Sequence, residues 1–352
     1  MVEEQGKIQM ADLPGQKRWN RIFNLPVRGK TGHYAARAEH PFRVMVQKEI
    51  SDHVRSWRFV LLISIIALTC LGSMYTSLTN LSEALKNSEG EDAFLFLRLF
   101  TASDGNLPSF FVFIGFLGPL LGISLGFDAV NSEQNRGTLG RILSQPIPRD
   151  YLINAKFVAS LSVISIMFFA LNLLVIGIGL ISIGIPPTPE EVIRIVFFML
   201  LSIIYVAFWL GLSILFSVRF RQPATSALSG IAAWLFCTVF YNLIVNLIVS
   251  ALSSAKAAIA FRSLSPEALE INLLRILPNQ LFSEATTTLL MPSVRSLGPL
   301  TMEQLYGAVP APLPLLQSLL IVWPQVTGLI AITVLCFVLA YTSFMKREIR
   351  PR

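Results

Sequence analysis

Six long apolar runs, separated by polar segments, dominate the chain. A helix that crosses a bilayer needs about 20 consecutive, mostly apolar residues, and each run reaches that length without an Asp, Glu, Lys, Arg or His. The pattern predicts an all-α integral membrane protein with a six-span domain over residues 59–345. Three prolines within 186–194 predict a tight turn between the third and fourth spans. The predicted spans are 59–79, 108–127, 157–185, 195–218, 224–252 and 318–345.

The distribution of Lys and Arg predicts the orientation, because basic residues favour the cytoplasmic side. Placing both termini inside puts 21 of the 28 Lys and Arg residues on that side. The short loops agree, with Arg219 and Arg221 inside and Glu190 and Glu191 outside. We therefore expect a multi-pass protein of the cell membrane with cytoplasmic N- and C-termini.

Segments outside the spans have distinct patterns. Residues 1–40 form a basic cytoplasmic tail, and residues 346–352 form a short one. Residues 41–58 mix apolar and charged positions, which favours an interfacial amphipathic helix lying on membrane lipid; an ordinary soluble helix is the alternative. In the outside segment 253–317, Ser265-Pro266 is a typical helix start and predicts short extracellular helices before the last span.

The composition supports the membrane assignment. Hydrophobic residues make up 53% of the chain and charged residues 14%, against about 25% charged in a typical soluble domain. This excludes a disordered chain, a secreted disulfide scaffold and a soluble nucleic-acid binder, despite the net charge of +7. Cys70, Cys237 and Cys336 are scattered among the apolar runs, so they predict neither a disulfide framework nor a metal site.

The chain lacks the residues of several kinds of catalytic or ion-coupled site. Ion-coupled transporters carry ionisable side chains inside their spans, and the six runs have none. The segment 24–31 ends in the Gly-Lys-Thr of a phosphate-binding loop, but Asn24 replaces its first Gly and no apolar strand precedes it. The three histidines have no metal-ligand spacing. We expect a protein that is not itself an enzyme and that holds no metal or cofactor.

Neutral polar residues and small residues remain as candidates within the spans. The polar ones are suited to hydrogen bonding between helices or to lining a substrate path; they are Asn172, Asn242, Asn246 and Gln325. The second span also carries a ridge of glycines that lets another helix approach closely, formed by Gly118, Gly122 and Gly126.

The loop 128–156, between the second and third spans, predicts a docking element. A short helix can run from Glu133 to Ser144, where Pro146 and Pro148 stop it. Glu133 and Arg136 have the spacing of an ion pair on one helix face. Leu139, Ile142 and Leu143 form an apolar stripe that would be buried against a soluble partner.

This loop resembles that of permease subunits of type-2 ATP-binding-cassette (ABC) exporters. The resemblance lies in an acidic residue, a Gly-Thr-Leu run, a Leu-Ser-x-Pro-Ile run, a basic residue and a Lys near the third span. These are Glu133, Gly137-Thr138-Leu139, Leu143-Ser144 with Pro146-Ile147, Arg149 and Lys156. The six-span layout and the helix before the first span are similar as well.

The resemblance implies a division of labour between subunits. Two copies of a separate cytoplasmic ATPase would bind ATP and Mg and hydrolyse the ATP, and this chain would pair with itself or a related permease. The helix around Glu133, Arg136, Gly137, Thr138, Leu139, Ile142 and Leu143 would be the coupling helix. One alternative is a scaffold that transmits ATPase movement to an extracytoplasmic protein without carrying a substrate. Another is a membrane enzyme that uses Glu267, Glu270 or Glu284.

Overall fold

The computed structural model describes residues 40–87, 94–103, 107–253, 266–292 and 313–347. These residues form helices and no strand, and six helical segments are long and apolar enough to cross a membrane. The all-α, six-span prediction is confirmed. The spanning segments are α3 (Trp57–Asn87), α5 (Phe110–Gly126), α8 (Arg149–Ile183), α9 (Pro189–Arg219), the run α10–η1–α11 (Pro223–Leu235, Phe236–Phe240, Tyr241–Ser253) and α15 (Leu315–Met345).

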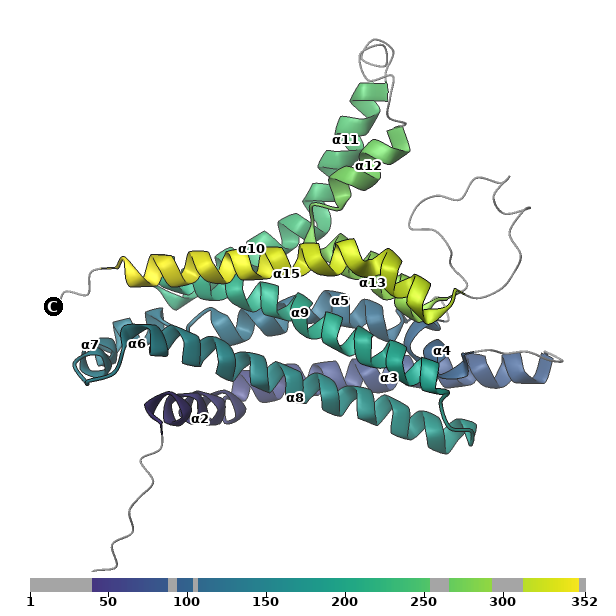
Figure 1. Ribbon diagram of the computed structural model, residues 1–352, viewed down its shortest axis with the longest axis horizontal. Coiled ribbons are helices and arrows are strands. Elements are labelled where there is room, and N and C mark those ends of the chain that lie inside the picture. Colours follow the sequence, from purple (N-terminus) through teal and green to yellow (C-terminus); the bar gives the residue numbers. More distant parts are fainter. Residues whose placement is uncertain (1–39, 88–93, 104–106, 254–265, 293–312, 348–352) are drawn as a thin grey trace, which may run out of the picture. The chain divides into compact units, whose positions relative to one another are not determined.

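Shorter helices flank the spanning ones. Helix α2 (Pro41–Val54) precedes the first span, and α6 (Asn131–Asn135) and α7 (Thr138–Leu143) lie between the second and third. Helix α4 (Leu95–Thr101) precedes the second span, and α12 (Pro266–Leu274) and α13 (Pro278–Leu290) precede the last. Figure 1 shows α6 and α7 at one end of the bundle and α4 and α13 toward the other. The interfacial position expected of residues 41–58 stays a prediction.

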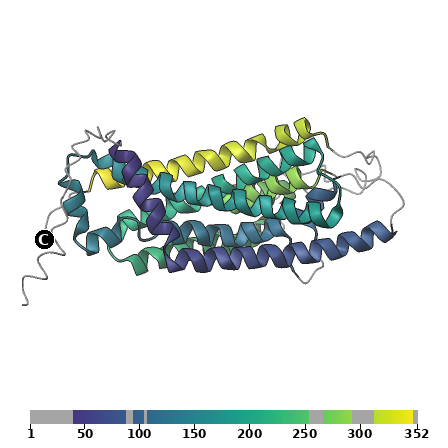
Figure 2. The same cartoon turned by 90° about the horizontal axis from the view of Figure 1, so that it is seen from below.

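Helix α9 forms the centre of the bundle. It packs against α5, α8, α10, α13 and α15, and 61% of its most apolar stretch is buried by protein, against 11% for the fifth span. Trp209 and Tyr205 are fully buried on it. Figure 2 shows the long helices running side by side, with α2 crossing them at one end.

The glycines of α5 lie where this helix meets α9. A Cβ atom added to Gly122 would lie 2.8 Å from the Val206 carbonyl oxygen and 2.9 Å from the Leu210 amide nitrogen. Added to Gly126, it would lie 2.9 Å from the Ser213 Cβ. The two backbones are therefore too close for any side chain, as expected of a small-residue ridge.

We expect Gly122→Ala to destabilise the protein by about 1–3 kcal/mol, because the added methyl group meets backbone atoms that cannot rotate away. Gly177→Ala on α8 is the matched control, since nothing lies within 4 Å of its added Cβ. Thermal unfolding of the detergent-purified variants would compare them. Equal midpoints for the two variants would contradict this view of the α5–α9 contact.

The break between the third and fourth spans is shorter than predicted. Helix α8 ends before Gly184, which has a φ of 77°, and α9 already begins at Pro189. Thr188 caps α9, because its hydroxyl accepts the Glu191 amide while the Glu191 carboxylate accepts the Thr188 amide. Proline is well suited to the first turn of a helix, so the predicted turn over residues 186–194 is wrong beyond residue 188.

Ionisable residues nevertheless lie within the bundle, just beyond the ends of the apolar runs. The apolar runs stop at charged residues, but the helices continue past them. Lys156 lies within α8 and Arg194 within α9, with exposed fractions of 4% and 0%. Both side chains are paired, as burial of a charge requires.

Helix α13 packs among the spanning helices and forms part of the bundle. It packs against α15, α9 and α5, as Figure 1 shows for α13 beside α15. Helix α12 is described from Pro266 onward, and the predicted N-cap Ser265 lies outside the described residues. The packing of α13 was not predicted, because its sequence is too polar and too short to be identified as a span.

Candidate functional site

The coupling loop, residues 128–156, folds into two short helices rather than one. Helices α6 and α7 are separated at Gly137, whose φ of 70° lies in the left-handed region that favours glycine. The Thr138 hydroxyl donates to the Glu133 carbonyl oxygen across the break, at 3.2 Å. The single helix predicted from Glu133 to Ser144 is therefore wrong, because the left-handed backbone at Gly137 interrupts it.

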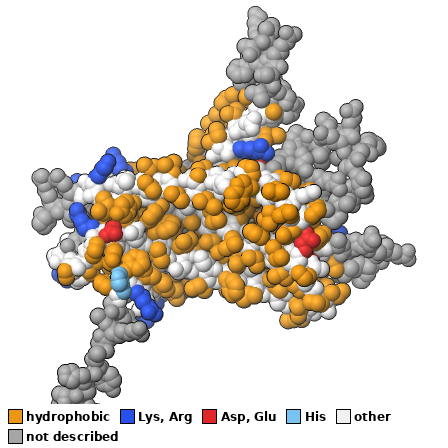
Figure 3. Space-filling view, viewed as in Figure 1, with side chains coloured by type: hydrophobic (Ala, Val, Ile, Leu, Met, Phe, Trp, Pro, Cys, Tyr) orange, Lys and Arg blue, Asp and Glu red, His pale blue; other side chains and the backbone are white. Residues whose placement is uncertain are grey.

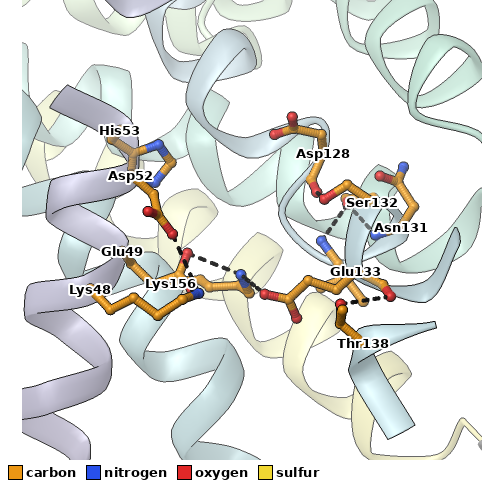
Figure 4. Close-up of polar contacts among 12 residues, drawn as sticks. Lys48, Glu49, Asp52, His53, Asp128, Asn131, Ser132, Glu133, Thr138 and Lys156 are labelled. Atoms are coloured by element: carbon orange, nitrogen blue, oxygen red, sulfur yellow. Dashed lines mark hydrogen bonds and ion pairs between the residues drawn. The ribbon is translucent and has the colours of Figure 1, made fainter. Parts of the chain in front are cut away.

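Lys156, near the start of α8, is the centre of a buried ion cluster. Its Nζ lies 2.7 Å from Glu133 Oε1 on α6 and 3.0 Å from Glu49 Oε2 on α2. Figure 4 shows the two carboxylates reaching Lys156 from two sides. The predicted pairing of Glu133 with Arg136 is wrong, because Lys156 binds Glu133 and Arg136 is exposed. We call Glu49, Glu133 and Lys156 the Lys156 cluster.

Further polar contacts surround this cluster, two of them within α2 and one between α2 and α8. Lys48 lies 3.1 Å from Glu49 Oε1 and 3.4 Å from Asp52. One turn further along, His53 Nε2 lies 2.9 Å from the Ser160 hydroxyl oxygen. Helix α2 therefore presents a polar face to α8, and its position depends on charge pairing as well as on apolar packing.

The electrostatics favour an ionised Glu49. Burial raises the pKa of a carboxyl group, but the nearby Lys156 and Lys48 ammonium groups outweigh it, so the pKa of Glu49 lies below its usual value. Burial also lowers the pKa of His53, against the opposing effect of Glu49. Burial thus favours the neutral form of His53, and the two carboxylates lie against the ammonium group of Lys156.

The coupling loop is also joined to the third, fourth and first spans. The Ser217 hydroxyl of α9 accepts the backbone amides of Val130 and Asn131, at 2.9 and 3.3 Å. Asp128 pairs with Arg58 of α3 at 2.9 Å, and the Arg58 guanidinium lies 5.0 Å from the centre of the Phe127 ring. The loop therefore contacts α3 and α9 directly and reaches α8 through Lys156.

A cavity of about 590 Å³ opens between α2 and the coupling loop. The Lys156 cluster lines it, together with exposed Arg136 and Arg141 of the loop. The second carboxylate oxygen of Glu133 is buried and has no hydrogen-bond partner in the described part of the chain. The cavity is thus lined by paired charges of the Lys156 cluster and by the exposed guanidinium groups of Arg136 and Arg141.

The predicted apolar stripe is only partly available to a partner. Leu139 is 3% exposed and packs in the core of this chain, and Ile142 packs partly against the same core. The expectation that Leu139 is buried against a partner is wrong, because the break at Gly137 turns it inward. The side chain of Leu143 lies outside the described residues. Among the other residues of α7, Gly140 and Arg141 are exposed.

The four polar candidates within the spans differ in their surroundings. Asn172 is buried and donates to the Phe168 carbonyl oxygen of its own helix, at 2.8 Å. Gln325 is buried and donates to Glu284 Oε2, at 3.2 Å. Asn242 and Asn246 are exposed on the fifth span. The structure therefore does not bring these four residues together.

The residues considered for an enzyme do not form a common centre. Glu284 is 7% exposed, and its carboxylate accepts hydrogen bonds from Arg275, Gln280 and Gln325. Glu270 is half-buried, and the side chain of Glu267 lies outside the described residues. Within the described ranges, no three His, Cys, Asp or Glu side chains are grouped in a way that could hold a metal ion.

Comparison of the sequence with known protein families identifies a family whose match covers nearly all of the helices described above. The family described as "ABC-2 family transporter protein" matches residues 43–349, which include most of α2, the coupling loop and all six spans. A search of curated proteins found no matching relative. Members of this family are membrane components of transporters whose ATPase is a separate subunit. The chain belongs to the ABC-2 transporter family and is a multi-pass membrane permease.

Proposed function

We propose that the chain is the permease subunit of an exporter that is driven by ATP hydrolysis on a separate cytoplasmic ATPase. The observation that carries this proposal is the Lys156 cluster, in which one buried ammonium group joins α2, α6 and α8. ATP and Mg would be bound by the ATPase, and this chain would supply the membrane path.

The contacts of the coupling loop suggest how movement of the ATPase reaches the spans. A displacement of α6 would pull α8 and α2 through Glu133 and Lys156. The same displacement would act on α9 through Ser217 and on α3 through Asp128. Because these contacts are short, and all except the exposed Arg58–Asp128 pair are largely buried, the loop and the ends of three spans would move together.

The fifth span supports pairing with a second permease chain. Only 11% of its most apolar stretch is buried by this chain, and exposed Asn242 and Asn246 lie on it four residues apart. Polar groups that face lipid hydrocarbon are costly, so such residues usually face protein or water. We propose that a second copy, or a related permease, covers this face.

The proposal places both termini in the cytoplasm. We expect Gln222→Cys to stay unlabelled by a membrane-impermeant thiol reagent in intact cells, and Asn272→Cys to be labelled. Both positions are exposed in this chain, so access to the reagent depends on the side of the membrane. Labelling after permeabilisation would control for reactivity, and the reverse pattern in intact cells would contradict the orientation.

Reconstitution with the cognate ATPase tests the function itself. Proteoliposomes that contain the assembled complex should move a candidate substrate away from the ATPase side when Mg-ATP is present, and should not do so with a hydrolysis-deficient ATPase. Stimulation of hydrolysis by candidate lipids and drugs would identify the substrate. ATP hydrolysis that only changes the binding of an extracytoplasmic protein would instead support a scaffold.

A further inference from the structure

Four basic side chains gather where α9 and α15 end. Arg219 closes α9, Arg221 lies in the turn before α10, and Lys346 and Arg347 follow the last residue of α15. Arg347 donates a hydrogen bond to the Val218 carbonyl oxygen, which brings the end of α15 onto the end of α9. We call these four residues the basic patch. Figure 3 shows Lys and Arg side chains at this end of the view, where α15 ends.

The basic patch has no acidic partner within the described residues. Arg219, Arg221 and Lys346 are exposed and form no ion pair there. Partial burial, together with the charges of Arg221 and Arg219, lowers the pKa of Arg347. The residues that follow, 348–352, add one Glu and two Arg to the sequence. The patch is therefore a local excess of positive charge in which the cations repel one another.

Helix dipoles explain only part of this arrangement. Cations are stabilised at the C-terminal ends of helices, and Arg219 and Lys346 occupy such ends. Arg221 lies between α9 and α10, and Arg347 donates to the Val218 carbonyl oxygen at the end of α9. A bound anion would relieve the repulsion among all four groups, which the two dipoles cannot do.

The surroundings of the patch are those of a membrane boundary. Exposed apolar side chains lie on both sides of the patch along the chain, with Leu339 46% and Met345 38% exposed on α15 before it and Leu228 68% exposed on α10 after it. The Phe216 and Phe220 rings lie 6.0 Å apart at the end of α9. A lipid leaflet has acyl chains in its interior, then an interfacial layer, and then charged headgroups. The exposed apolar surface, the aromatic rings and the cations of this region follow the same order.

We propose that the basic patch binds the phosphate of an anionic phospholipid, whose acyl chains lie along the exposed apolar surfaces of α10 and α15. A phospholipid headgroup and a free phosphate ion both carry the phosphate group that such a patch would bind. Guanidinium and ammonium donors bind phosphate through charge-assisted hydrogen bonds. This lipid site is independent of the proposed ATP-driven transport, because it requires neither the ATPase nor the coupling loop.

The test uses the full-length chain in detergent and measures retention of dioleoylphosphatidylglycerol by native mass spectrometry, with dioleoylphosphatidylcholine as the zwitterionic comparison. Each basic residue near an anionic membrane surface strengthens binding by a factor of about five. The double variant Arg221→Gln/Lys346→Gln should therefore bind the anionic lipid about 25-fold more weakly. Arg221→Lys/Lys346→Arg keeps both charges and should retain most of the affinity.

Arg136→Gln/Arg141→Gln is the matched control, because it removes two exposed charges from the coupling loop. Unchanged binding by this control, together with the loss in the patch variant, would support the proposal. An equal loss in both variants would overturn it, since binding would then depend on net charge alone. Displacement of the lipid by millimolar inorganic phosphate would identify a free-anion site instead. Loss of ATPase copurification with intact lipid binding would assign the patch to the protein partner and would also overturn it.

Discussion

Lys156→Met should abolish ATP-driven transport and lower the thermal stability of the permease. The substitution removes the ammonium group that Glu49 and Glu133 share, and leaves two buried carboxylates close together. Breaking a buried ion pair by removing one partner costs about 3–5 kcal/mol. The displaced carboxylates would also separate α6 from α8, so ATP hydrolysis by the bound ATPase should continue without substrate movement.

Two further variants separate coupling from stability. Lys48→Met removes a cation that contacts the same Glu49 but has a side chain 57% exposed; exposed pairs contribute about 0–1 kcal/mol, so little change is expected. The neutral combination of Glu49→Gln, Glu133→Gln and Lys156→Met should regain much of the thermal stability but not transport. Full transport by the neutral variant would show that the cluster is only structural.

Arg194→Leu should have the largest effect on folding. Arg194 is fully buried and donates to the Leu289 and Leu313 carbonyl oxygens, the Ser318 hydroxyl and Glu190. It therefore holds the start of α9 to the end of α13 and to the start of α15. Each carbonyl oxygen left without a donor costs about 1–3 kcal/mol, and leucine replaces none of these hydrogen bonds.

Membrane yield and monodispersity measured by size-exclusion chromatography, followed by thermal unfolding, would report this loss. Arg194→Lys keeps the charge but supplies fewer donors in a fixed geometry, so an intermediate loss is expected. Glu190→Gln should have little effect, because its side chain is 37% exposed and can reach water. Wild-type yield and stability for Arg194→Leu would contradict the role assigned to these contacts.

The fold was predictable from sequence to the extent that it depends on local pattern. Runs of about 20 apolar residues are sufficient to identify the spans, and the spacing of Gly118, Gly122 and Gly126 indicated a close helix contact. The ends of α8 and α9 were not predictable in this way. An apolar run was taken to end at its first charged residue, and the sequence does not show whether that charged side chain faces water or pairs with another part of the protein.

The candidate site was predictable only in part. Glu133 and Lys156 were identified through a resemblance, but their pairing joins residues 23 positions apart, and Glu49 reaches Lys156 from 107 positions away. No helical periodicity encodes such contacts. The break at Gly137 could have been anticipated, since glycine in the middle of a short polar helix favours a left-handed turn; that break explains why Leu139 points inward.

We expect the ATPase to dock on the coupling loop, and crosslinking tests this most directly. Gly140 is exposed and nothing lies within 4 Å of its added Cβ, so Gly140→Cys can carry a short thiol-linked photocrosslinker without disturbing α7. Gln222→Cys, in the loop between the fourth and fifth spans, is the comparison, and the parent chain controls for its own cysteines. In the assembled complex, we predict a permease–ATPase adduct from Gly140→Cys and none from Gln222→Cys. A complex that copurifies intact but forms no adduct from Gly140→Cys would contradict the account.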